Sequence, residues 1–146
     1  MFLYKIMKKL KSEEIPLKLE LLKNYKKARA SNMTLPHGQV KLPVYMPVGT
    51  KGSIKGLTSE EVENLDCWLL LGNTYHLNNS PGSNFLGLIG GLRNFMNWRR
   101  NILTDSGGFQ MVSLCKFCEV TEEGVTFEHP QTKEKMFLRP EDSIKA

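Results

Sequence analysis

The sequence predicts an α/β fold in which parallel strands alternate with helices, preceded by a small antiparallel β segment. Apolar runs at 43–49, at 67–77 and at the start of 102–110 are separated by patterns typical of helices. Strands that are apolar throughout are typical of parallel sheets covered on both faces. No run approaches the roughly 18 apolar residues that a membrane span needs. We therefore expect a globular chain without a transmembrane segment.

The antiparallel segment is expected at the start of the chain. Leu17, Leu19 and Leu21 alternate with charged residues, which is the period of a half-buried strand. Residues 33–43 resemble a hairpin that turns at His37-Gly38, because glycine readily adopts the positive φ that such turns need. The run at 43–49 follows as a short buried strand.

Two helices are predicted between the later apolar runs. In 57–65, Thr58 can cap a helix and Glu61 stands three residues later, the spacing of a capping box. Residues 91–98 form the second helical pattern. Trp68 and Trp98 are most simply core or helix-packing residues, since a large indole dominates buried area.

Polar groups gather where each predicted strand ends: Gly49-Thr50, then 73–76, then Asp105-Ser106. In parallel α/β folds the carboxyl ends of the strands are where functional sites are built. The three clusters are therefore expected to share one rim of the sheet. His76 at this rim is expected to be a hydrogen-bonded structural residue, and His129 a surface residue.

The stretch ILTDSGGFQ at 102–110 has two interpretations, and both stay open. Asp105 held at a strand end, glycines that allow close approach of backbone N–H groups, and the ring of Phe109 would suit a nucleobase, because a carboxylate can exchange protons with ring nitrogens. Alternatively, Asp105 caps the next helix and the glycines serve the turn.

The charge of the chain is concentrated at its N-terminus. Residues 1–30 carry nine Lys or Arg against three Glu, whereas the remaining residues carry eleven bases and twelve acids. A basic segment can bind a polyanion, since lysines release counterions from phosphates. A solvated terminal segment is the simpler alternative.

The cysteines suggest neither a disulfide framework nor a metal site. Their number, three, is odd, which suits a reducing compartment. Cys115 and Cys118 have the spacing of half a zinc site or a redox pair, but a closed zinc site needs four ligands. No metal site is predicted in this chain.

Several blocks closely resemble the tRNA-guanine transglycosylases, in family order and spacing. They are MPVGT (46–50), LGNTYHL (71–77), FMNW (95–98), LTDSGGFQMVSL (103–114) and EVTEEGV (119–125). The resemblance covers about Leu17 to the end. Phe109, where bacterial members usually have tyrosine, and the residues after Phe95 make the chain look like the eukaryotic queuine tRNA-ribosyltransferase branch.

The resemblance implies an incomplete (β/α)8 TIM barrel, with about the first three βα units in 17–146 after a basic N-terminal extension at 1–16. It implies exchange of guanine for queuine at wobble position 34 of tRNAs with GUN anticodons, through a covalent tRNA intermediate. Asp105 would accept the proton of the incoming base. Ser106, Gly107, Gly108 and Phe109 would hold the base together with Asp105, and Asn73, Thr74 and Tyr75 would support the site.

The resemblance also implies partners and a cofactor. These are tRNA, the queuine or guanine base, and a non-catalytic paralogous subunit in a heterodimer. Zinc belongs to the full-length family, with ligands and the nucleophilic aspartate beyond this chain, so no cofactor is expected here. The implied location is the cytoplasm, with peripheral attachment to the mitochondrial outer membrane as an alternative.

Because the chain ends at Ala146, we expect a fragment, a short isoform or an incomplete gene model that is inactive alone. Two other functions stay open. One is a non-catalytic fragment that docks on a full-length transglycosylase subunit. The other, remote, is a small α/β phosphate-binding protein in which Ser106, Gly107 and Gly108 form an anion nest.

Overall fold

The computed structural model describes residues 17–113, 118–129 and 132–145. The predicted extension at 1–16 and Cys115 lie outside these residues. The chain divides into two compact units, Met1–Tyr45 and Met46–Ala146, each of which is described by itself. The expected mixture of strands and helices is confirmed. The boundary predicted between residues 16 and 17 stays a prediction.

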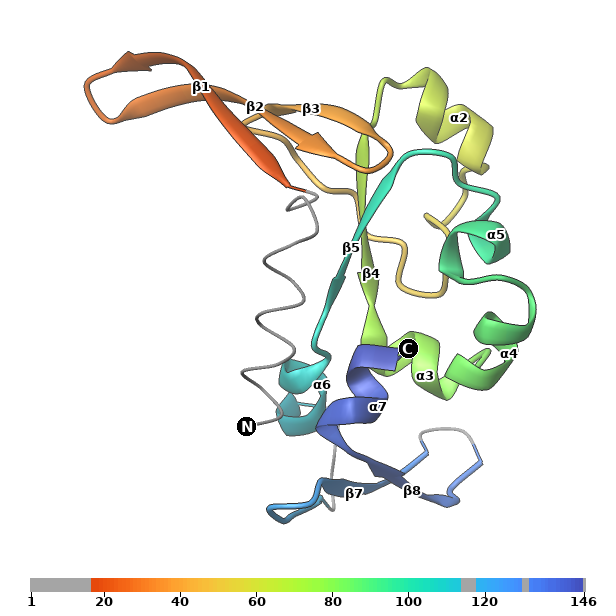
Figure 1. The fold of residues 1–146 in the computed structure, drawn as a ribbon. Helices are drawn as coiled ribbons and strands as arrows, with labels where there is room; N and C mark the ends of the chain where they lie inside the picture. Colours follow the sequence, from red (N-terminus) through yellow and green to blue (C-terminus); the bar gives the residue numbers. More distant parts are fainter. Residues whose placement is uncertain (1–16, 114–117, 130–131, 146) are drawn as a thin grey trace, which may run out of the picture. The chain divides into compact units, whose positions relative to one another are not determined.

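The N-terminal unit is a three-stranded antiparallel sheet of β1 (Lys18–Tyr25), β2 (Ala28–Leu35) and β3 (Gly38–Leu42), in that order (Figure 1). The predicted hairpin is confirmed, but its two-residue loop is Pro36-His37. Gly38 begins β3 with φ 120°, so glycine is needed one residue later than expected.

The predicted half-burial of β1 is wrong. All eight residues of β1 are exposed, including Leu19 and Leu21. Alternation of apolar and polar residues indicates only which side of a strand each side chain takes. A buried side also needs a second layer, and the described residues of this unit form one sheet.

The C-terminal unit begins with an extended segment that was predicted as a buried strand, and this prediction is wrong. Only one parallel bridge forms, between Val48 and Leu71, flanked by hydrogen bonds from Gly49 N to Leu71 O (2.8 Å) and from Leu71 N to Pro47 O (2.9 Å). Val48 is 47% exposed. The reason is chemical, since the prolines at 43 and 47 have no N–H to donate to a ladder.

The centre of this unit is the parallel pair β4 (Leu69–Asn73) and β5 (Asn101–Asp105), which run side by side in Figure 1. In the sequence, α2 (Ser59–Asn64) precedes β4. Three further helices lie between β4 and β5, namely α3 (Thr74–Asn79), α4 (Ser83–Leu88) and α5 (Leu92–Met96). The capping box predicted at Thr58 is confirmed. Full coverage of both sheet faces is not observed, because Leu103 of β5 is 42% exposed.

Two apolar clusters hold the C-terminal unit together. One joins Val62, Leu70, Met96 and Trp98, so the prediction for Trp98 is confirmed. Trp68 is half-buried instead, and its ring lies 4.2 Å below the guanidinium of Arg100.

After β5 come α6 (Gly108–Ser113) and a second antiparallel sheet that sequence patterns did not predict. Its strands are β6 (Glu119–Val120), β7 (Val125–Glu128) and β8 (Lys135–Leu138), and α7 (Pro140–Lys145) follows. The second apolar cluster links this sheet to α3 through Tyr75, Phe127 and Leu138. His129, expected on the surface, is buried at the end of β7, where its Nδ1 accepts a hydrogen bond from Thr132 N (3.0 Å).

An ion pair ties α2 to the segment before β5. Glu63 is buried, and its carboxylate accepts hydrogen bonds from Nε and Nη2 of the largely exposed Arg99. The backbone N–H of Arg99 donates to the same carboxylate at 3.3 Å. The geometry is bidentate, which is the stronger form of a carboxylate–arginine contact.

The pH dependence of stability is expected to report this pair. The hydrogen bonds from Arg99 hold the pKa of Glu63 below its ordinary value of 4.5. A lowered pKa in the folded state means that the pair stabilises fully above about pH 4.5 and loses its effect as the pH falls through the folded-state pKa. In urea unfolding of the whole chain, Glu63→Gln should lower the free energy of unfolding near neutral pH. The difference from wild type should shrink as the pH falls below about 4.5.

Glu123→Gln, which changes an exposed glutamate between β6 and β7, is the matched control and should leave the curve unchanged. An equal loss for Glu63→Gln at every pH would contradict the assigned role of the carboxylate charge.

Candidate functional site

Asp105 lies at the carboxyl end of β5, directly beside Asn73 at the end of β4. The two strands are parallel and in register from Leu69↔Asn101 to Asn73↔Asp105, so their last residues meet at one edge of the sheet. Asn73 and the next residue, Thr74, are buried, whereas Asp105 is half-buried. The expected shared rim is thus present for the clusters that begin at Asn73 and at Asp105.

Three N–H groups converge on the carboxylate of Asp105. The side-chain amide of Asn73 donates to Oδ2 at 2.7 Å, and the backbone N–H groups of Thr74 and Gly107 donate to Oδ1 at 3.2 and 3.1 Å. The hydroxyl of Thr74 donates to the backbone carbonyl of Asp105. These contacts fix the plane of the carboxylate. A carboxylate accepts about four hydrogen bonds, so Oδ2, with one donor among the described contacts, has room for a proton or an N–H of a ligand.

Asn73 is oriented by a second contact. Its side-chain oxygen accepts a hydrogen bond from His76 N at 3.2 Å, which makes Asn73 the N-cap of α3. Because the oxygen is used by the helix, the amide nitrogen is the end that faces Asp105. One residue therefore starts a helix and positions the carboxylate.

The hydrogen bond from Gly107 N to Asp105 closes an Asx turn, so the turn role that the structural alternative gave to the glycines is present. Gly107 is buried with φ 68°, and a Cβ built on it would lie 2.7 Å from both Cβ and the backbone N of Tyr75. The residue after Asp105-Ser106 must therefore be glycine for the loop to pack against α3. Tyr75 itself is buried, with its ring centre 5.5 Å from that of Phe127.

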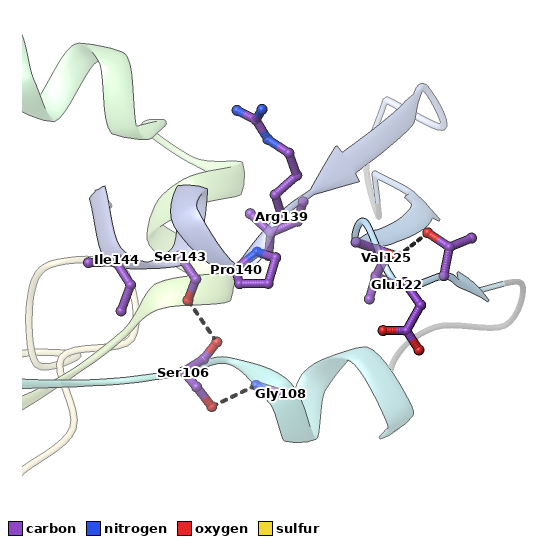
Figure 2. A pocket seen from close by; sticks show the side chains of 11 residues that line it. Ser106, Gly108, Glu122, Val125, Arg139, Pro140, Ser143 and Ile144 are labelled. Atoms are coloured by element: carbon purple, nitrogen blue, oxygen red, sulfur yellow. Dashed lines mark hydrogen bonds between the residues drawn. The ribbon is translucent and has the colours of Figure 1, made fainter. Parts of the chain in front are cut away.

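Ser106 and Gly108 border a cavity of about 440 Å³ between this loop, the β6–β8 sheet and α7 (Figure 2). Ser143 Oγ donates to the carbonyl of Ser106 at 3.3 Å, and Gly108 N donates to Ser106 Oγ at 3.3 Å. The cavity wall is largely apolar and is completed by Val125, Leu138, Pro140 and Ile144. The cavity residues from β7, β8 and α7 were missed by the sequence patterns, although Val125 and Phe127 show the alternation of a strand.

The remaining predicted residues lie in different surroundings. Phe109, at the start of α6, is 76% exposed and does not line the cavity. Gly49-Thr50 follows the bridge to Leu71 at the same end of β4, but no described hydrogen bond joins it to Asp105. The roles assigned to all these residues in binding or catalysis stay predictions.

Neither a metal cluster nor a membrane helix is found in the part of the chain that the structure describes. No group of three or more His, Cys, Asp or Glu side chains there could hold a metal ion. No described helix combines the length and apolar character needed to cross a membrane. The zinc ligands that the resemblance implies would lie beyond this chain, and no chemical step is assigned to zinc here.

Replacing Gly107 by alanine is expected to destabilise the chain by about 1 to 3 kcal/mol, the cost of holding a non-glycine residue in a left-handed conformation. The contact with the Tyr75 backbone adds to this cost. Urea unfolding of the whole chain measures it. Gly108→Ala is the matched control, because its added Cβ would meet only Ser106 Oγ at 3.4 Å. Equal stability of the two variants would contradict the tight packing of Gly107.

Comparisons with known proteins show which family the chain resembles. The family model described as queuine tRNA-ribosyltransferase matches residues 24–146. The chain is 56% identical over 117 residues to a queuine tRNA-ribosyltransferase catalytic subunit of Caenorhabditis elegans, covering 80% of this chain and 29% of that protein. The subunit of the same name from Schizosaccharomyces pombe is 52% identical over 118 residues, covering 81% of this chain and 29% of that protein.

A bacterial relative, the queuine tRNA-ribosyltransferase of Rickettsia canadensis, is 50% identical over 119 residues, covering 82% of this chain and 33% of that protein. The chain thus spans about a third of the length of the curated relatives it matches. The matched region includes the Asp105 loop and the ends of β4 and β5. On the strength of the family match and these identities, the chain belongs to the queuine tRNA-ribosyltransferase family.

Proposed function

We propose that this chain provides the base-binding and proton-accepting part of a queuine tRNA-ribosyltransferase catalytic subunit. The reaction is the exchange of guanine for queuine at wobble position 34 of tRNAs for Asp, Asn, His and Tyr. The observation that carries the proposal is the Asp105 carboxylate, fixed by Asn73, Thr74 and Gly107 with one acceptor position of Oδ2 open. The names and identities of the relatives support it.

The proposed fold of the complete protein is a (β/α)8 barrel, of which this chain contributes about the first three βα units. Three parallel segments support this proposal. Residues 47–49, β4 and β5 follow one another in the chain and are neighbours in the same order, with helices in both intervals. Sequential parallel strands joined by helices are how such barrels are built.

The proposed mechanism is a double displacement with two carboxylates. An aspartate outside this chain attacks the ribose carbon, the bond to guanine breaks, and the enzyme is joined covalently to the tRNA. Guanine leaves with the bonding electron pair and takes up a proton from water, which balances the proton that queuine later gives up. The incoming queuine then forms the new bond to the same carbon through a ring nitrogen, the bond to the aspartate breaks, and the proton of that nitrogen passes to Asp105. The open position of Oδ2 is suited to accept it, since the other described donors already hold the carboxylate in place.

The loop after Asp105 is proposed to hold the base. Phe109 has an accessible ring on which a flat heterocycle can stack. Gly108 is exposed and allows the heterocycle to approach the backbone, and Gly107 places it there by letting the loop pack against Tyr75. Asn73, Thr74 and Tyr75 act through Asp105 and Gly107 rather than by touching the base.

The proposal includes further components of the complete enzyme. Zinc would be held by residues outside this chain. The partners would be tRNA and a non-catalytic paralogous subunit in a heterodimer. The location would be the cytoplasm or the surface of the mitochondrial outer membrane.

Asp105→Asn is expected to reduce base exchange by at least about 100-fold, the lower range for loss of a proton-transfer group. Asparagine keeps the size and one acceptor oxygen, but its amide nitrogen cannot take the proton. The measurement is incorporation of labelled guanine into a tRNA with a GUN anticodon. The enzyme would be a chimaera in which this chain replaces the matching part of the Caenorhabditis elegans subunit.

Asp66→Asn is the matched control, because Asp66 has a positive φ that asparagine tolerates and lies outside the site. It should leave exchange unchanged. Normal turnover by Asp105→Asn would refute the assigned role. Base exchange by the 146-residue chain alone would show that the nucleophile lies within it.

A further inference from the structure

The N-terminal unit has a charge that the proposed chemistry does not use. Its described residues, 17–45, carry six bases and one acid, whereas 46–146 carry ten bases and twelve acids. The six bases are Lys18, Lys23, Lys26, Lys27, Arg29 and Lys41, and the acid is Glu20. The positive charge is therefore concentrated on the β1–β3 sheet and its first turn.

The strand register sorts these residues between the two faces of the sheet. Directly paired residues share a face. One face carries three lysines, and we call it the lysine face; its residues are Lys18, Glu20, Lys23, Tyr25, Ala28, Ala30, Asn32, Thr34, Gln39 and Lys41. The opposite face is formed by Leu19, Leu21, Asn24, Arg29, Ser31, Met33, Leu35, Gly38, Val40 and Leu42. The two faces therefore differ in character, because most of the large apolar residues of the sheet lie on the face opposite the lysines.

A bulge in β1 makes this arrangement possible. The register shifts between Leu21 and Lys23, so Lys23 pairs with Ala30 and not with Arg29. Without the shift, Lys23 would take the same face as Leu21, two residues earlier. With it, Lys18 and Lys23 lie on one face about 16 Å apart along the strand, and Lys41 lies about 10 Å across, on β3.

The lysines of this face are exposed and unpaired among the described residues. Lys18, Lys23 and Lys41 are exposed, as are Lys26 and Lys27 in the turn that follows β1. None of the described ion pairs involves a base from residues 17–45. Three exposed ammonium groups with only Glu20 between them repel one another, and a polyanion would relieve that repulsion.

The geometry favours RNA over a membrane as the polyanion. A surface that binds lipid combines bases with large apolar residues that enter the headgroup layer. Here the leucines of β1 that the register places lie on the opposite face. Tyr25 is the large exposed aromatic on the lysine face, and Lys26 Nζ lies 5.5 Å from its ring centre. This cation occupies a face of the ring, which argues for phosphate contacts and against stacking of a base.

We propose that the lysine face of the β1–β3 sheet binds the phosphate backbone of RNA without reading its sequence. The choice of tRNA as the RNA rests on the proposed function. The argument for an RNA surface rests on the charge and register of the sheet and does not need that function. Contacts of this kind bring a substrate to the protein and orient it, while specificity arises elsewhere.

The test is binding of the whole 146-residue chain to fluorescently labelled tRNA, measured by anisotropy at several salt concentrations. Replacing Lys18, Lys23 and Lys41 together by glutamine is expected to weaken binding. The slope of log K against log salt should fall in magnitude by about 2 to 3, roughly one unit per lost phosphate contact. A tRNA with a GUN anticodon and one without it should lose affinity equally.

Replacing Lys51, Lys55 and Lys135 by glutamine is the matched control, because these exposed lysines of the other unit give the same change in charge. It should leave the slope nearly unchanged. Circular dichroism of both variants checks that the fold is kept. An unchanged slope for the Lys18, Lys23 and Lys41 variant would overturn the proposal, as would binding to anionic vesicles of phosphatidylserine and phosphatidylcholine without binding to tRNA.

Asp105→Asn separates this inference from the proposed function. If base exchange in the chimaera does not depend on Asp105 while the lysine variant loses RNA binding, the proposed function fails and the RNA surface stands. If base exchange in the chimaera depends on Asp105 while the lysine variant keeps its affinity for tRNA, the RNA surface fails and the proposed function stands.

Discussion

The in-register pairing of β4 with β5 is the constraint on which the candidate site depends. It places Asn73 and Asp105 side by side at the last rung of a parallel ladder, and the hydrogen bonds to the carboxylate follow from that position. A shift of one residue would move Asp105 away from Asn73 and would also turn its side chain to the opposite face of the sheet. Asn73 makes the arrangement rigid, because it caps α3 with its oxygen and meets Asp105 with its nitrogen.

Elements whose cause is local could be predicted from the sequence. The capping box at Thr58 needs only residues three apart, and it is present. The strand that ends at Asp105 and the one that ends at Asn73 were predicted from apolar runs, and their parallel pairing followed from the helices between them. The neighbourhood of Asp105 and Asn73 could be expected for the same reason. The family resemblance added the proposed chemistry, which the residues alone left undecided.

Elements that depend on long-range contacts could not be predicted. The run at 43–49 is a different case, because its prolines are visible in the sequence and limit the ladder to one bridge, and the apolar pattern alone was given too much weight. The short strands β6, β7 and β8 gain their order from packing of Phe127 and Leu138 against Tyr75, which is far away in sequence. The donors to Asp105 from Thr74 and Gly107 are backbone groups, and no side-chain pattern identifies them. The buried position of His129 likewise follows from the β7–β8 hairpin.

The extra residue in β1 has a consequence for how this unit can vary among relatives. In a regular strand, loss of one residue turns every later side chain to the opposite surface of the sheet. Here, loss of Leu22 alone would restore a regular ladder in which Lys23 still pairs with Ala30 and Tyr25 with Ala28, so both residues would keep their face. Loss of the bulge residue is therefore a length change that the strand accommodates with both surfaces kept, and it requires no second length change before the turn at Lys26.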